Sequence, residues 1–457
     1  MKRTAAHIAL LLLTLFLLKT NAHGQDYPWL SSNNMMIEAR GHYGFFYHHH
    51  FEMEQFNAHY TAFEASIYQS TYGKKEWQIL YNYPYIGATF YHSRLGGYEE
   101  LGQVYALYPF INYPLYRNET WMTTFKFGVG LAWLTRCFDH LDNFANFSIG
   151  SHLNGAVNLS FEYRHELTPR LISVASLGLT HFSNGATKSP NYGLNTFSGA
   201  WGLAYYLRDP RTNALFAKRP EYYKFEFDGK NWFSIDLAFG MGIKDVSQTF
   251  GKNEPYRVYE GTARALAQFT TCSRAGLSLS LTKDNSDKAT PGWYTEGNNT
   301  YFTNHHTDEN GIDTIQTIHP KEYQLIKPNL GLCYSMTMDR LSYLFELGVH
   351  LDLRARKDGL WKAHEVKNSD GSPVLNQHGQ PIQELPPFSL ASNLLKGSLY
   401  QKITLQYEIR ENLFAELALT THLARADYLC AGISYRFNQK YYLNKNAKSS
   451  KSIPGLH

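Results

Sequence analysis

A histidine and a serine stand two residues apart in the stretch 177–207, LGLTHFSNGATKSPNYGLNTFSGAWGLAYYL. A serine hydroxyl is a poor nucleophile until a neighbouring imidazole accepts its proton, and a third group that fixes the tautomer of the imidazole improves this base. His181, Ser183 and Asn195 have the side chains for base, nucleophile and orienting group. The backbone NH groups of Ser183 and Asn184, with the Asn184 amide, are candidate donors to the oxyanion of a tetrahedral intermediate. The pattern fits a serine nucleophile with a histidine base, but an HxS pair is common and a rim histidine is often only interfacial.

The segments that carry these residues alternate between apolar and small or polar side chains, which predicts extended strands. Period-two geometry places His181 and Ser183 on the same face as Leu179, and Asn195 on the same face as Phe197. In both strands this is the more apolar face, which in a membrane barrel is turned to lipid. All three polar residues are therefore expected on an outer wall near one rim. Polar groups are costly there unless they have a task or lie at headgroup level, and a hydrolase acting on lipid needs this placement.

The stretch resembles the signature of PagL-type lipid A deacylases, which are outer-membrane barrel enzymes that remove an ester-linked acyl chain from lipopolysaccharide. The shared pattern is the HxSN block, the PNxG block at 190–193 and a polar residue twelve positions after the serine. The resemblance implies His181 as base, Ser183 as nucleophile and Asn184 as oxyanion support. The third family member is usually Glu, whereas this chain has Asn195. Asn can orient a histidine but supplies no charge to the imidazolium, so lower activity or a different pH profile is expected.

The resemblance extends upstream to longer relatives from the Bacteroidetes group and covers roughly 25–207. It includes 82–88 (NYPYIGA) and 143–154 (NFANFSIGSHLN). Asn143, Asn146 and Ser151 are expected either to shape the rim near the site or only to structure their loop. The resemblance implies lipid A or lipopolysaccharide in the outer leaflet as substrate, and neither a metal nor a cofactor.

The start of the chain predicts its compartment. Two basic residues at 2–3 precede the apolar run 8–18 and a small-residue boundary before Gln25, which predicts a secretory signal peptide over 1–24. The apolar run is too short for a membrane-spanning helix, and no other segment approaches about 20 apolar residues. Together with the strand pattern, this predicts a protein of the bacterial outer membrane.

About sixteen alternating segments lie between residues 37 and 437, for example 121–135 and 232–243. Short connections and long polar loops, such as 285–323, separate them. The pattern predicts an all-β fold, an antiparallel transmembrane β-barrel of about 14 to 16 strands in one barrel. The alternative is an eight-stranded barrel followed by a second eight-stranded unit. A secreted β-sandwich or propeller also alternates, but soluble strands average about 5 or 6 residues.

The chain divides accordingly into regions with different expected roles. These are the signal peptide 1–24, a PagL-like barrel region with the catalytic hairpin at 25–208, a periplasmic connection at 209–229, additional barrel strands at 230–437 and a flexible basic tail at 438–457.

Composition limits the possible partners. Lys plus Arg number 43 against 39 Asp plus Glu, a net charge of +4, so nucleic-acid binding driven by charge is unsupported. The four cysteines are far apart in the sequence, which is neither a zinc pattern nor a dense disulfide framework. Two functions remain: a serine esterase acting on lipid A or, less specifically, phospholipid, and a non-catalytic barrel, channel or lipid-binding, that retains a degenerate site. No feature bears on the oligomeric state.

Overall fold

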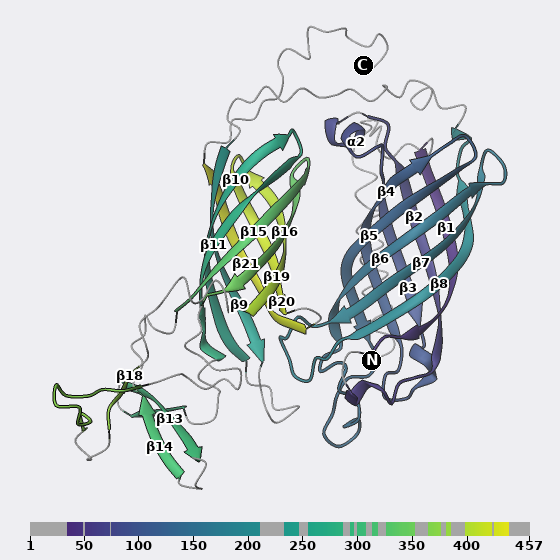
Figure 1. Cartoon of the computed structure of the whole chain (residues 1–457). Coiled ribbons are helices and arrows are strands. Elements are labelled where there is room, and N and C mark those ends of the chain that lie inside the picture. The colour runs from purple at the N-terminus through teal and green to yellow at the C-terminus, as the bar shows by residue number, and fades with distance from the viewer. Residues whose placement is uncertain are drawn as a thin grey trace.

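The structure, a computed structural model, contains two β-barrels and a small separate sheet (Figure 1). The described residues are 34–48, 51–73, 75–210, 233–245, 255–286, 293–296, 299–307, 313–318, 326–351, 364–375, 381–384, 398–422 and 425–437. The predicted signal peptide, nearly all of the predicted connection and the predicted tail lie outside the described residues. No helix within the described residues is long and apolar enough to cross a bilayer.

The first barrel is closed by eight antiparallel strands. They are β1 Met35–Phe46, β2 His59–Ser70, β3 Tyr85–Ser93, β4 Val104–Arg117, β5 Trp121–Leu134, β6 Leu153–Glu166, β7 Leu171–Ser183 and β8 Leu194–Tyr206. A short helix, α2 (Glu76–Leu80), connects β2 to β3, and 3-10 turns η3 (Phe51–Met53) and η4 (Leu95–Gly97) lie in two other connections. We call the end of the barrel with the connections 135–152 and 184–193 the loop end, and the opposite end the turn end.

The second barrel is also closed by eight antiparallel strands. They are β9 Phe233–Asp245, β10 Pro255–Thr270, β11 Ser273–Asp284, β15 Ile326–Met338, β16 Leu341–His350, β19 Ser398–Arg410, β20 Leu413–His422 and β21 Arg425–Phe437. The separate sheet has the strand order β12 (Trp293–Glu296), β13 (Asn299–Thr307), β14 (Asp313–Ile318), β18 (Gln383–Glu384) and β17 (His364–Glu365).

The predicted all-β antiparallel barrel fold is confirmed, but the preferred single barrel of 14 to 16 strands is wrong. The alternative with two eight-stranded units is what the structure contains. Strand β8 pairs with β1 from Met36↔Tyr206 to Phe46↔Thr196, so no edge of the first sheet is left for β9. Strand β9 instead pairs with β21, for example Phe239↔Ile433. Each unit therefore satisfies its own backbone hydrogen bonds, as a membrane-spanning sheet must.

Side chains alternate between an apolar exterior and a polar lumen in both barrels. Leu131, Trp201, Phe239 and Leu332 are each at least 60% exposed on the outer walls. The lumen side of the strands is rich in buried polar residues, among them Arg40 on β1 and Lys126 on β5. This is the pattern of a barrel whose outer wall meets lipid.

Buried ion pairs fill the lumen of the first barrel. Arg40 lies 2.8 Å from Glu162 and 2.9 Å from Glu64, and Arg164 lies 2.8 Å from Glu38. An eight-stranded barrel is just wide enough for side chains to fill its interior. These side chains therefore occupy the space that a channel would need.

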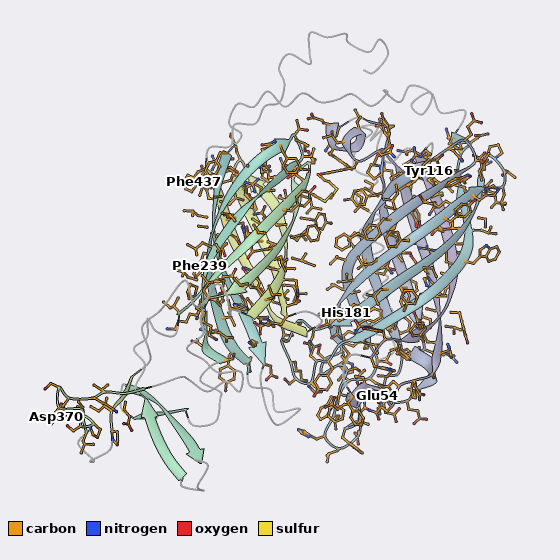
Figure 2. The ribbon with its side chains drawn as sticks, viewed as in Figure 1. Glu54, Tyr116, His181, Phe239, Asp370 and Phe437 are labelled. Carbon is orange, nitrogen blue, oxygen red and sulfur yellow. The ribbon has the colours of Figure 1, made fainter. Side chains whose placement is uncertain are left out.

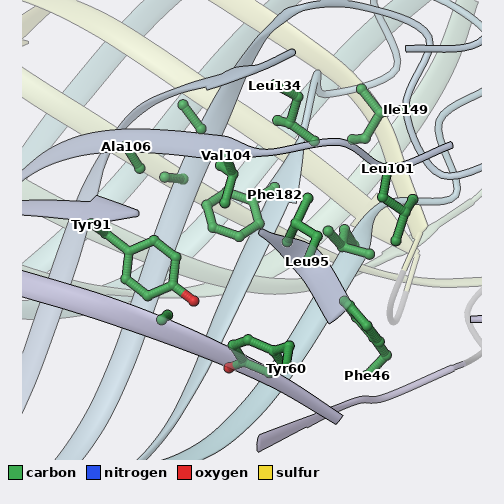
Figure 3. Close-up of a cluster of buried hydrophobic side chains, with 14 of the residues drawn as sticks. Phe46, Tyr60, Tyr91, Leu95, Leu101, Val104, Ala106, Leu134, Ile149 and Phe182 are labelled. Carbon is green, nitrogen blue, oxygen red and sulfur yellow. The ribbon is translucent and has the colours of Figure 1, made fainter. Parts of the chain in front are cut away.

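An apolar cluster closes the same lumen at the loop end (Figure 3). Tyr60, Tyr91 and Phe182 come from strand ends, whereas Leu101 and Ile149 come from loops that fold over the opening. All five side chains are almost fully buried. The cluster fixes the ends of the strands that carry the candidate site.

The two barrels contact each other at the turn end. The Tyr81 hydroxyl donates to the carbonyl oxygen of Cys272 at 3.3 Å. Farther along the facing walls, near the middle of β5, the rings of Phe127 and Tyr343 meet edge to face with centroids 5.6 Å apart. The barrels also touch at the loop end, where the candidate site lies.

Candidate active site

The candidate site lies on the outer wall of the hairpin β7–β8. His181 and Asn195 are direct cross-strand partners, and Ser183 follows two residues along β7 on the same face. The alternate residue, Phe182, is fully buried inside the barrel, where its ring lies 5.9 Å from that of Tyr91. This inward anchor holds the end of β7 while its polar neighbours point outward.

His181 and Asn195 are hydrogen-bonded. The Nδ1 atom of His181 lies 2.6 Å from Oδ1 of Asn195. An amide oxygen can only accept a hydrogen bond, so this contact places the imidazole proton on Nδ1. Nε2 is then unprotonated and able to accept a proton, as a general base requires.

Gly193 packs closely against the imidazole of His181. It has a φ of +76°, and a Cβ added there would lie only 2.8 Å from Cε1 of His181. Glycine adopts this left-handed conformation without steric penalty and leaves room for the ring. The glycine of the PNxG block therefore helps to fix the position of the imidazole.

The Ser183 hydroxyl has different partners from those expected. Within the described residues, Nδ2 of Asn191 donates to Ser183 Oγ at 3.0 Å and the Gly185 NH donates to it at 3.1 Å, whereas no hydrogen bond joins Ser183 to His181. Catalytic hydrogen bonds are often absent or long without substrate and form only in the complex. No role is predicted for Asn191 from the sequence, and its place in the PNxG block is the signal that points to it.

Asn184, predicted to support the oxyanion, is engaged elsewhere in this structure. Its Nδ2 donates to Ser151 Oγ at 3.1 Å and to the Lys188 carbonyl at 2.8 Å, and its backbone NH donates to Asn191 Oδ1 at 3.0 Å. Asn184 therefore holds the loop 184–193 in shape here. A donor role toward an oxyanion requires one of these hydrogen bonds to be exchanged.

The loop between β5 and β6 supports the site from one side. The Gly193 NH donates to the Ser148 carbonyl at 2.9 Å, and a Cβ on Gly150 would lie 2.8 Å from the Pro190 carbonyl oxygen. Asn143 and Asn146 both donate to the Glu100 carbonyl, at 2.9 and 2.8 Å. Their contacts serve to structure this loop, and Ser151 accepts a hydrogen bond from Asn184.

Two regions of the chain match known protein families. Residues 61–204 match the family described as Lipid A 3-O-deacylase (PagL). Residues 389–439 match Acyloxyacyl hydrolase, C-terminal domain, which places this second match on β19–β21. No curated protein sequence matches the chain.

Solved structures of outer-membrane barrels are also similar to parts of the chain. Neisserial surface protein A shows 8% identity, with 38% of this chain and 97% of that chain covered and a TM-score of 0.28. The outer membrane enzyme PagL shows 15% identity, with 36% and 97% covered and a TM-score of 0.25.

The family match and the lipid-facing barrel walls together confirm the predicted location: this is a protein of the bacterial outer membrane. The match begins in β2 and ends in β8 at residue 204, so it includes His181, Ser183 and Asn195 and all but the last two residues of the hairpin that carries them. The resemblance to PagL-type lipid A deacylases that the HxSN block indicated is thus confirmed, over residues 61–204 of this chain.

Proposed function

We propose that the protein is an outer-membrane serine esterase that removes an ester-linked acyl chain from lipid A. The observation that carries the proposal is the hydrogen bond between His181 and Asn195 on a lipid-facing wall, with Ser183 beside them on the same strand. An imidazole oriented in this way next to a serine is the arrangement that activates a hydroxyl. The deacylase family match over the same hairpin supports the substrate class.

The proposed reaction proceeds in two steps. In the first step His181 Nε2 takes the hydroxyl proton of Ser183 while Oγ attacks the ester carbonyl carbon of the lipid. The tetrahedral intermediate collapses, the bond to the sugar oxygen breaks, and His181 returns the proton to that oxygen. In the second step water attacks the acyl-serine by the same route and releases the fatty acid. Asn195 keeps the proton on Nδ1 throughout, because its Oδ1 accepts a hydrogen bond from that atom.

Asn191 can contribute to this mechanism as a hydrogen-bond donor. Its amide holds the Ser183 hydroxyl at 3.0 Å in the resting structure. Rotation of the serine side chain toward His181 breaks this contact, which frees the amide and the Gly185 NH to donate to a substrate oxygen. Both groups lie within reach of Oγ and are therefore candidates for the oxyanion donors.

Mass spectrometry of lipid A tests the proposal. Cells that produce the wild-type chain should lose one acyl group from lipid A, and cells that produce Ser183→Ala should not. Ser173→Ala is the matched control, because Ser173 lies on the outward face of the same strand, away from the site. If lipid A keeps all of its acyl groups with the wild type as well as with Ser183→Ala, the protein is a non-catalytic barrel. The missing contact between His181 and Ser183 would then explain the lack of activity.

A further inference from the structure

The catalytic loop, residues 184–193, is attached to the second barrel. Asp245, the last residue of β9, accepts a hydrogen bond from the Ser189 NH at 2.9 Å through its carboxylate. Its backbone NH donates to the Ala186 carbonyl at 2.8 Å, and its carbonyl oxygen accepts one from the Ser189 hydroxyl at 3.2 Å. Three hydrogen bonds thus join one residue of the second barrel to the loop that carries the serine's partners.

The same loop also has an apolar contact with the second barrel. Gly185 has a φ of +66°, and a Cβ added there would lie 3.2 Å from Leu429 Cβ and 3.5 Å from Leu419 Cδ1. These leucines belong to β21 and β20. Gly185 is the residue whose NH donates to Ser183 Oγ. The residue that packs against the second barrel is therefore hydrogen-bonded to the proposed nucleophile.

The loop is therefore held between two supports. On one side the β5–β6 loop binds it through the Ser148 carbonyl, and on the other side β9, β20 and β21 of the second barrel contact it. Figure 2 shows His181 at the loop end of the first barrel, on the side that faces the second barrel. The support from the second barrel comes from outside the 61–204 match to the deacylase family.

We propose that Asp245 positions the catalytic loop. The second barrel then contributes a positioning residue to the active site. Asp245 is buried, and the NH-to-carboxylate contact with Ser189 is a charge-assisted hydrogen bond, which is shorter and stronger than a neutral one. Ser189 lies two residues from Asn191, which holds the Ser183 hydroxyl. A displacement of Ser189 is thus passed along the loop to the groups around the nucleophile. This inference rests on the proposed esterase function.

Asp245→Ala in the full-length protein tests the role of the carboxylate. The two backbone hydrogen bonds to Ala186 and Ser189 remain in this variant, so we expect a partial effect. The kcat for a defined lipid A substrate should fall about tenfold, because a small misplacement of reacting groups slows catalysis strongly. KM should change by less than about twofold, since the lipid-facing wall is intact. Asp245→Asn retains an oxygen that can accept from Ser189 and should restore most of the rate.

Asp284→Ala is the matched control. Asp284 ends β11 at the same end of the same barrel, is also buried, and hydrogen-bonds Ser286 and Lys244 instead of the catalytic loop. Its loss removes a buried carboxylate from the second barrel, but Lys244 keeps its ion pair with Asp427 and Asp245 keeps its hydrogen bonds to the catalytic loop, so kcat should stay at the wild-type value. A similar fall in both variants would show that general damage to the second barrel is responsible and would overturn the positioning role.

Labelling of Ser183 by a fluorophosphonate probe provides a second readout that does not depend on lipid. Asp245→Ala should be labelled about tenfold more slowly than the wild type, and Ser183→Ala should not be labelled. Wild-type kcat and labelling in Asp245→Ala, with an inactive Ser183→Ala, would overturn this inference and leave the proposed function intact. Full activity of Ser183→Ala would overturn both.

Discussion

At the scale of single residues, the unusual feature of the site is an amide where the deacylase family usually has a carboxylate. Asn195 fixes the His181 tautomer through a 2.6 Å contact. In the proposed mechanism it would add no negative charge beside the imidazolium, so Asn195 would orient the ring without stabilising its charge. The two parts can therefore be separated by substitution.

Asn195→Ala should lower kcat by about ten- to a hundredfold without abolishing it, because the ring loses one hydrogen bond that orients it. Asn195→Glu should raise kcat above the wild-type value, because a carboxylate stabilises the imidazolium. Steady-state rates on lipid A in detergent measure both effects. An unchanged rate in Asn195→Ala would remove Asn195 from the mechanism.

At the scale of elements, the site depends on a hairpin whose loop is tightly packed. Sequence alternation was sufficient to predict that His181 and Ser183 share an outward face, because side-chain direction in a strand has a period of two. It could not predict that Ser183 contacts Asn191, because that contact depends on a loop conformation with positive φ at Gly185 and Gly193. Alternation also identifies the face of a strand but not its partner, so the closure of β8 on β1 was not predictable from the pattern.

Gly193→Ala tests the packing of this loop against the imidazole. The added Cβ would lie 2.8 Å from Cε1 of His181, so the ring must move and kcat should fall at least tenfold. Gly97→Ala is the control, because Gly97 has a φ of +83° but nothing within 4 Å of the added atom. Both variants carry the same backbone penalty, about 1 kcal/mol. Equal activities in the two variants would show that contact with His181 is not important.

At the scale of the whole molecule, each barrel is closed and has its own buried charges. In the second barrel, Arg264 pairs with Glu416 at 2.8 Å and Lys402 with Glu260 at 2.6 Å, which parallels the network around Arg40 in the first barrel. Such networks occupy the lumen with side chains. The two matched family regions thus lie in two separately closed units, 61–204 in the first and 389–439 at the end of the second.

Arg40→Ala should destabilise the first barrel by about 3–5 kcal/mol, because it leaves buried carboxylates without their partner. Arg40 contacts Glu38, Glu64 and Glu162, so several charges are affected at once. The temperature at which the protein loses its compact migration in SDS gels measures the change. Arg340→Ala, at an exposed turn of the second barrel, is the control and should leave that temperature unchanged.

The attachment of residues 184–193 to Asp245 has a consequence for the order of events during assembly. The first barrel is complete once β8 meets β1, yet the three hydrogen bonds between Asp245 and the loop also require β9 to lie beside it. If the proposed function holds, a newly made chain completes its active site only when the second barrel has docked against the loop.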